Sequence, residues 1–249
     1  MRPGINCRFQ YILFFVAILF LFPVFVTAQS ESYGTWTSVS YEKDLKKLDI
    51  EAETELRTIY MVSLIDRWSL GISADYKLNK YLKVGAGYQF MNSLEYKTDD
   101  NGLLISNFYV KNYFIRNRFN LSGTGKYKLD DFSFSLRERV QVTTKEERER
   151  TDGTIDDYKV NPAWVWRNRF QLSYNIPHCK ITPSASVESF YQLNNPDGNT
   201  FDNMRYILSF EYKINKHNYV ELYGVVNSEL DSDDASGKYI LGASYKFSY

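Results

Sequence analysis

Cysteine and histidine are almost absent from this chain of 249 residues, which contains two of each. Metal centres and nucleophilic catalytic sites draw on clusters of these side chains. Cys179 is isolated in the sequence, and His178 and His217 fall in predicted turns. We therefore predict no metal site and no cofactor.

An excess of charge of either sign is also missing, because 30 basic residues balance 30 acidic ones. A nucleic-acid-binding domain presents a strongly basic surface, so we exclude nucleic acid as a partner. Outside the N-terminal segment, the chain has no run of about 18 apolar residues of the kind that marks a membrane helix. The absence of such a run excludes a helical membrane protein.

The N-terminal segment differs from the rest of the chain. Arg2 and Arg8 precede an apolar run over residues 11–22, and the segment ends at Ala28 before Gln29. The run is shorter than the ~20 residues of a membrane-spanning helix, and the small residue suits a signal peptidase. We predict a signal peptide over residues 1–28, cleaved between Ala28 and Gln29, and one domain over residues 29–249. The alternative is an uncleaved N-terminal anchor.

Period-two alternation of polar and apolar side chains dominates the remainder. Leu48, Ile50 and Ala52 fall on one face of a strand, and Glu51 and Glu53 fall on the other. The same pattern recurs in eleven segments: residues 35–41, 48–58, 68–78, 82–90, 119–129, 132–142, 166–176, 181–191, 206–214, 220–226 and 239–249. The sequence therefore predicts an all-β fold. Pro183 cannot donate a hydrogen bond to a ladder, so we expect a bulge or irregularity there.

The connections between these segments alternate between short and long. Short ones are expected at residues 43–47, 79–80, 130–131, 177–180 and 215–217, and longer polar ones near 59–67, 91–111, 144–163, 193–203 and 228–237. Outer-membrane barrels have short periplasmic turns and longer extracellular loops. The alternation is typical of that class.

A soluble lipocalin-like barrel and a membrane barrel share this periodicity, but they turn the apolar face in opposite directions. Tyr and Trp near the ends of the apolar rows resemble the aromatic girdles of a spanning barrel. Mid-strand Arg and Glu on the other face suit a polar lumen. The chain ends on an alternating strand with Tyr245, Phe247 and Tyr249, which resembles a C-terminal assembly signal. We predict a transmembrane antiparallel up-and-down β-barrel.

The expected strand number is 10 to 12. Eleven segments are seen, whereas single-chain bacterial barrels have an even number of strands. Either a twelfth strand lies in a long segment such as residues 91–116, or the N-terminal piece threads the lumen and leaves ten.

Several segments resemble a known family: WTSVSYEKDL with LDIEAETELR, YKLNKYLKVGAGYQF, NRFNLSGTGKYKL with SLRERVQ, ITPSASVESFYQ and RYILSFEYKIN. They are similar to the outer-membrane β-barrel family catalogued as the domain of unknown function numbered 2490, over essentially the whole mature chain. The resemblance implies an exported outer-membrane barrel with no assigned activity. Glu138 falls on the lipid-facing positions of its strand, which puts the register of residues 136–140 in doubt.

The predicted inward face carries fourteen basic and eight acidic side chains. The candidate lumen-lining residues are Glu51, Glu53, Glu55, Arg57, Arg118, Arg137, Arg139, Arg167, Arg169, Glu188, Arg205 and Glu211. We favour paired charges that fill a narrow interior, as in a structural or interaction barrel. The alternative is a passive pore or transporter whose basic lining favours small anionic solutes.

An embedded lipid hydrolase is a third reading, but both histidines lie in predicted periplasmic turns, away from the rim where lipid substrates would enter. We predict no enzymatic activity. Asp231, Asp233 and Asp234 before Gly237 resemble a calcium loop but lack the distal glutamate of an EF-hand. The expected partners are outer-membrane lipids, lipopolysaccharide and the barrel-assembly machinery.

Overall fold

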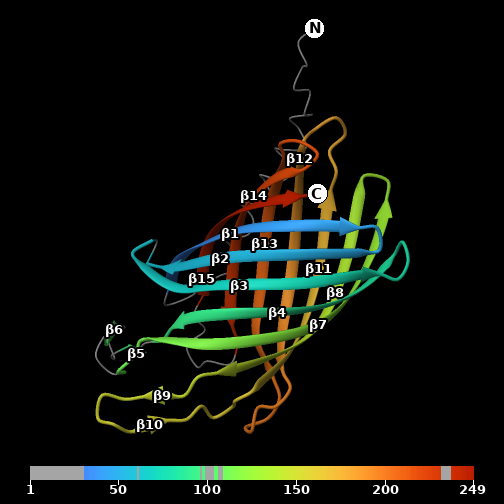
Figure 1. Ribbon diagram of the computed structural model, residues 1–249. Helices are drawn as coiled ribbons and strands as arrows, with labels where there is room; N and C mark the ends of the chain where they lie inside the picture. The colour runs from blue at the N-terminus through green and yellow to red at the C-terminus, as the bar shows by residue number, and fades with distance from the viewer. Residues whose placement is uncertain (1–30, 61, 96, 99–103, 106–108, 231–236) are drawn as a thin grey trace.

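The alternating segments become long strands that close into one barrel (Figure 1). The computed structural model describes residues 31–60, 62–95, 97–98, 104–105, 109–230 and 237–249. The wall consists of β1 (Glu31–Leu45), β2 (Leu48–Ile59), β3 (Leu64–Lys77), β4 (Leu82–Leu94), β7 (Tyr113–Leu129), β8 (Phe132–Lys145), β11 (Ala163–Tyr174), β12 (Ile181–Gln192), β13 (Phe201–Lys213), β14 (Asn218–Glu229) and β15 (Gly237–Ser248). The predicted all-β barrel is confirmed.

The ring contains eleven strands in the order β1-β15-β14-β13-β12-β11-β8-β7-β4-β3-β2. Ten of the pairings are antiparallel, and β1 pairs with β15 in parallel, from Glu31↔Gly237 to Glu42↔Ser248. The expectation of an even number is therefore wrong. An odd number of alternating strands gives the first and last strands the same direction, so the ring closes through a parallel pair.

No twelfth wall strand lies in the described parts of residues 91–116. There β4 extends to Leu94 and β7 begins at Tyr113, while β5 (Lys97–Thr98) and β6 (Leu104–Ile105) pair only with each other. A second small ribbon, β9 (Arg148–Glu149) with β10 (Ile155–Asp156), lies in the connection from β8 to β11. Both ribbons lie at the same end of the barrel (Figure 1), which we call the long-loop rim.

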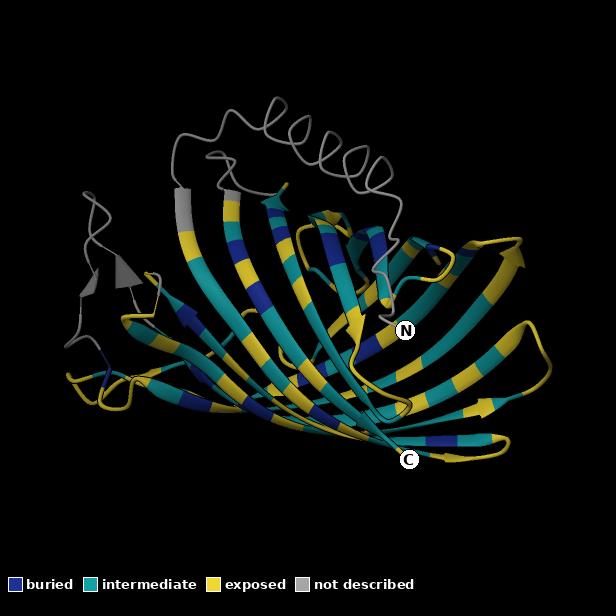
Figure 2. Ribbon diagram, turned by 90° about the horizontal axis from the view of Figure 1, so that it is seen from above, coloured by how far each residue is buried: buried dark blue, intermediate teal, exposed yellow. Residues whose placement is uncertain are grey.

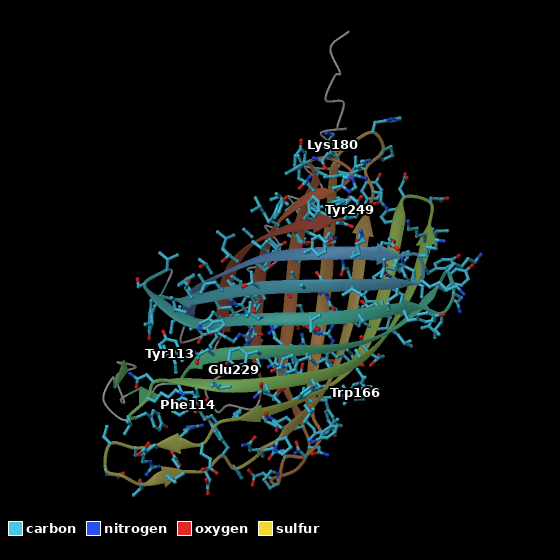
Figure 3. All side chains as sticks on the ribbon, in the orientation of Figure 1. Tyr113, Phe114, Trp166, Lys180, Glu229 and Tyr249 are labelled. Carbon is cyan, nitrogen blue, oxygen red and sulfur yellow. The ribbon has the colours of Figure 1, made fainter. Side chains whose placement is uncertain are left out.

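The opposite end, which we call the short-turn rim, carries the five predicted short connections. For example, β7 and β8 are joined by Asp130 and Asp131 alone. One connection at the long-loop rim is shorter than expected, because β2 runs to Ile59 and β3 begins at Leu64. Figure 3 places Lys180 and Tyr249 toward the short-turn rim and Tyr113, Phe114 and Glu229 toward the other.

The wall has an apolar outer face and a polar inner face. Leu70, Ile72, Leu121 and Leu241 are all more than half exposed on the outside. More exposed and less exposed positions alternate along strands such as β3 and β4 (Figure 2). Inward Ser69, Gln141 and Glu188 are buried. A polar interior inside an apolar outer surface is the arrangement of a membrane barrel rather than of a soluble one.

The predicted irregularity at Pro183 is wrong. The pairing of β12 with β13 continues through Pro183↔Phe210, and the register shifts instead between Phe190 and Tyr191. The amide of Lys213 donates to the carbonyl of Lys180. By alternation, the nitrogen of Pro183 points toward β11, and the pairing of β12 with β11 ends at Ser184. The missing donor therefore interrupts no ladder.

Glu138 does lie on the outer face, and the register around it is regular. It stands opposite Gly123 on β7 and Asn168 on β11. Its carboxylate accepts a hydrogen bond from Nε1 of Trp166 at 2.8 Å. The charge on the lipid-facing side is therefore a local feature with its own donor and not a sign of a shifted strand.

The predicted signal peptide lies outside the described residues. Within them, no helix is both long enough and apolar enough to cross a membrane.

Candidate functional site

The lumen collects the charged residues that alternation assigns to the inner face. Glu51, Glu53, Glu55 and Arg57 come from β2, Arg118 from β7, Arg137 and Arg139 from β8, Arg167 and Arg169 from β11, Glu188 from β12, and Arg205 and Glu211 from β13. Each of these residues is an even number of positions along its strand from a residue that is buried or lines a cavity, so its side chain lies on the inner face. The structure brings some of them into direct contact and leaves others apart.

Glu188 forms the first cluster, with arginines from three other strands. Its side chain is 2% exposed. Nη2 of Arg167 and Nη2 of Arg137 lie 2.9 Å and 3.2 Å from Oε1, and Nη1 of Arg205 lies 3.3 Å from Oε2. Gln141 and Asn227 accept further hydrogen bonds from Arg167 and Arg205, respectively. One buried carboxylate thus joins β8, β11, β12 and β13.

Glu55 forms the second cluster on the other side of the ring. Its carboxylate accepts two hydrogen bonds from Arg57, at 2.8 Å and 2.9 Å, and one from Arg67 on β3, at 2.9 Å. The fork of a guanidinium matches the two oxygens of a carboxylate, so the Arg57 contact is bidentate. This cluster joins β2 to β3.

Two inward aromatic rings connect the clusters. The guanidinium carbon of Arg57 lies 3.7 Å from the ring centroid of Trp36 on β1, and that of Arg205 lies 5.1 Å from the same ring. Arg167 and Arg205 lie 4.6 Å and 4.8 Å from the ring of Phe190. These are cation–π distances. Arg205 on β13 and Arg57 on β2 thus contact one ring on β1, although β14 and β15 separate β13 from β1 in the wall.

We call this layer the lumen belt: Trp36, Glu55, Arg57, Arg67, Arg137, Arg167, Glu188, Phe190 and Arg205. It runs from β3 through β2 and β1 across to β13, β12, β11 and β8.

Two cavities lie on opposite sides of the belt. One, of about 330 Å³, reaches toward the short-turn rim, where Glu211 and Lys246 are 36% and 35% exposed. The other, of about 460 Å³, lies at the long-loop rim between Lys145, Tyr158 and Asn194. Their linings have no residue in common. We call the first the lower cavity and the second the outer cavity.

The lower cavity has charges of both signs. Its acidic residues are Glu51, Glu53, Glu55, Glu188, Glu211 and Glu221, and its basic residues are Arg137, Arg167, Arg169, Arg205 and Lys246. The excess of basic residues expected over the whole lumen is therefore not reproduced around this cavity. Arg118 contacts Thr143 at 3.1 Å, outside the lower cavity.

Some charges in the lumen lack a partner of opposite sign. Among the described residues, no carboxylate lies within 4.0 Å of the guanidinium of Arg139 or Arg169, and no basic group lies that close to Glu51, Glu53 or Glu221. These five side chains remain available to solvent ions or to a ligand.

Trp36 and Phe190 were missed as lumen residues. The sequence analysis assigned neither ring to a face, although each shares its parity with inward residues, Ser38 in one strand and Glu188 in the other. Counting alternate positions along each strand, without regard to residue type, would have placed both rings in the lumen. The outward aromatics near the strand ends, such as Tyr41, Trp68 and Tyr76, are well exposed on the outer face.

The three C-terminal aromatic residues lie on the outer face of the last strand. Tyr249 is held by several groups at the seam with β1. Its amide donates to the carbonyl of Glu42 at 2.9 Å, Nζ of Lys43 lies 3.9 Å from its ring centroid, and His217 stacks on it at 5.6 Å. The two histidines lie in short turns, and Nδ1 of His217 is 2.7 Å from the carbonyl oxygen of Ser248.

Tyr249→Ala should weaken closure of the ring, because it removes one cation–π contact and one ring stack while keeping the backbone hydrogen bonds. We expect a loss of about 1–2 kcal/mol in the free energy of unfolding. Reversible urea unfolding of the refolded barrel measures this. Tyr76→Ala is the control, since its ring is exposed on the outer face of β3, away from the seam; equal losses for the two variants would contradict a special role for Tyr249.

No group of three metal-ligating side chains occurs within the described ranges. The acidic run Asp231, Asp233 and Asp234 lies outside them.

The family described as "Protein of unknown function (DUF2490)" matches residues 33–236. No curated protein matches this chain in sequence. The β domain of the Bordetella autotransporter BrkA superposes with a TM-score of 0.51 at 9% sequence identity, covering 82% of this chain and 83% of that one.

Two porin structures are also similar. The NanC porin gives a TM-score of 0.47 at 13% identity, covering 82% of this chain and 89% of that one. The anion-selective porin from Comamonas acidovorans gives 0.35 at 9% identity, covering 82% and 55%. At 9% identity, the likeness to the BrkA β domain concerns the fold alone.

Proposed function

This chain belongs to the family described as "Protein of unknown function (DUF2490)", and since that description assigns no activity, we propose that it is a structural or interaction barrel of the outer membrane with a lumen closed by charge pairs. The observation that carries the proposal is the lumen belt. Its side chains contact one another across the barrel, from Arg67 on β3 to Arg137 on β8.

The belt suits a closed barrel better than an open pore. Glu188 is 2% exposed and has a guanidinium at each oxygen, so moving it aside would leave three buried cations without their shared anion. Breaking a buried ion pair costs about 3–5 kcal/mol. Thermal motion rarely supplies that energy.

A passive pore for small anions is the second candidate. The observation that favours it is the pair Arg139 and Arg169, which have no carboxylate within 4.0 Å among the described residues. The lower cavity speaks against anion preference, because its acidic residues outnumber its basic ones. We propose no enzymatic activity, since His178 and His217 lie at the short-turn rim and His217 contacts the C-terminal strand.

Planar-bilayer recording tests whether the lumen is closed to ions. The refolded barrel should give no steady conductance, whereas Trp36→Ala combined with Phe190→Ala should produce channel openings, because it removes the two rings between the arginines without unpairing a carboxylate. Trp68→Ala combined with Phe90→Ala is the matched control, since these two rings contact each other on the outer face, and it should stay silent. Steady conductance of the unaltered barrel would overturn the proposal and favour the pore; its anion-to-cation permeability ratio would then test anion preference.

The proposed location is the outer membrane after cleavage at Ala28/Gln29, with the short-turn rim in the periplasm. The proposed partners are outer-membrane lipids and lipopolysaccharide at the outer face and the barrel-assembly machinery at β15. Mass spectrometry of the mature chain isolated from an outer-membrane fraction tests the cleavage site and the location together.

A further inference from the structure

The lower cavity has a mainly acidic wall, which also contains Lys246 of β15, and a mainly basic wall, which also contains Glu188 of β12. Glu51 and Glu53 come from β2 and Glu221 from β14, whereas Arg169 comes from β11 and Arg137 from β8. In the ring, β11 lies five strands from β2 in one direction and six in the other. Glu51 and Glu53 therefore face Arg169 across the barrel, whereas Glu221 on β14 lies three strands from β11.

Arg137 pairs with Glu188 in the lumen belt, and Glu221 accepts a hydrogen bond from Ser244, but most charges on these walls have no ion-pair partner within the protein. Among the described residues, no basic group lies within 4.0 Å of Glu51, Glu53 or Glu221, and no carboxylate lies that close to Arg169. Glu211 stands directly opposite Glu221 in the sheet, and its one basic contact, Nζ of Lys246, is 3.7 Å away. Nε of Arg169 is buried without a hydrogen-bond partner in the described structure.

The size and access of the cavity suit a small molecule. Its volume of about 330 Å³ is at the lower end of the range for ligand pockets. Exposure falls from Glu211 and Lys246, at more than a third, to Glu188, at 2%. The cavity therefore opens at the short-turn rim and ends at the lumen belt.

From this arrangement we propose that the lower cavity binds a small zwitterion, of the class of an amino acid or dipeptide. Its carboxylate lies on the side of Arg169 and Arg137, and its ammonium lies on the side of Glu51, Glu53 and Glu221. A monoanion would meet the basic wall but leave the acidic wall unneutralised, and a monocation would do the reverse. A molecule that carries both charges at its two ends neutralises both walls at once.

Calorimetric titration of the refolded full chain with three matched probes tests the proposal. Glycylglycine carries both charges, N-acetylglycylglycine carries only the carboxylate, and glycylglycinamide carries only the ammonium. Glycylglycine should bind about tenfold or more tightly than either analogue, since one hydrogen bond to a charged group contributes about 1.5–3 kcal/mol. Equal binding of the three probes, or no heat with any of them, would overturn the proposal.

Two variants that each remove one charge test which wall binds which end of the ligand. Glu53→Gln should reduce the affinity for glycylglycine and for the amide about tenfold and leave the acetylated probe unchanged; Arg169→Gln should do the opposite, weakening the two carboxylate-bearing probes. Glu146→Gln and Lys128→Gln, which lie outside the cavity lining, are the matched controls, and circular dichroism confirms folding of each variant. The proposal is wrong if the controls reduce affinity as much as the wall variants. Conductance and binding are separate readouts, so a conducting barrel that binds zwitterions would contradict only the proposed closure.

Discussion

Glu188→Ala should cause the largest loss of stability of any single charge removal in the barrel. Arg137, Arg167 and Arg205 would then lie close together without the carboxylate that joins them. Removing one partner of a buried pair costs about 3–5 kcal/mol, because it leaves uncompensated buried charge. Reversible urea unfolding of the barrel refolded in lipid vesicles measures the effect, and an uncharged denaturant avoids screening the ion pairs.

The matched control for this prediction is Glu211→Ala. Glu211 lies on the neighbouring strand with the same inward orientation, but it is 36% exposed and its nearest basic atom is 3.7 Å away. Exposed pairs contribute about 0–1 kcal/mol, so we expect little change. Losses of similar size in the two variants would mean that the Glu188 cluster does not stabilise the fold.

Gly242→Ala should also destabilise the barrel, for a steric reason. An added Cβ at position 242 would lie 2.0 Å and 2.1 Å from ring atoms Cε2 and Cζ of Tyr223, which faces it from β14. The ring must move into the lower cavity, which it lines. Overpacking of this kind typically costs about 1–3 kcal/mol.

Gly224→Ala serves as the control for the glycine prediction. Gly224 belongs to the same pair of strands but points to the outer face, and no atom lies within 4 Å of its added Cβ. Replacing glycine by alanine lowers the conformational entropy of the unfolded chain equally at both positions, but only position 242 has the clash. The prediction fails if the two alanine variants unfold at the same urea concentration.

Much of this fold could be predicted from the sequence because a strand has a fixed period. The alternation of Leu48, Ile50 and Ala52 with Glu51 and Glu53 determines the facing of β2 without any knowledge of its neighbours. The short turns followed in the same way, since Asp130 and Asp131 interrupt two alternating segments. Periodicity carries no information on how the first and last strands meet, so the sequence alone predicts only a range of ten to twelve strands.

The site was harder to predict because its contacts depend on register and on reach across the lumen. Parity places Glu188 and Arg167 inside, but only the strand registers bring Arg137, Arg167 and Arg205 to the same carboxylate. Trp36 was missed for a different reason: only charged side chains were considered as lumen residues, although the position of Trp36 in β1 is inward. The charges of the two walls were visible in sequence, but their separation across the ring was not.

The parallel pairing of β1 with β15 gives the polypeptide a net direction through the bilayer. In a ring with an even number of strands, both ends of the chain emerge on one side. Here β1 begins at the long-loop rim and β15 ends at the short-turn rim. A peptide epitope joined before Glu31 and one joined after Tyr249 would therefore be displayed to different compartments. The eleven wall strands, an odd number, leave the two ends on opposite sides of the membrane.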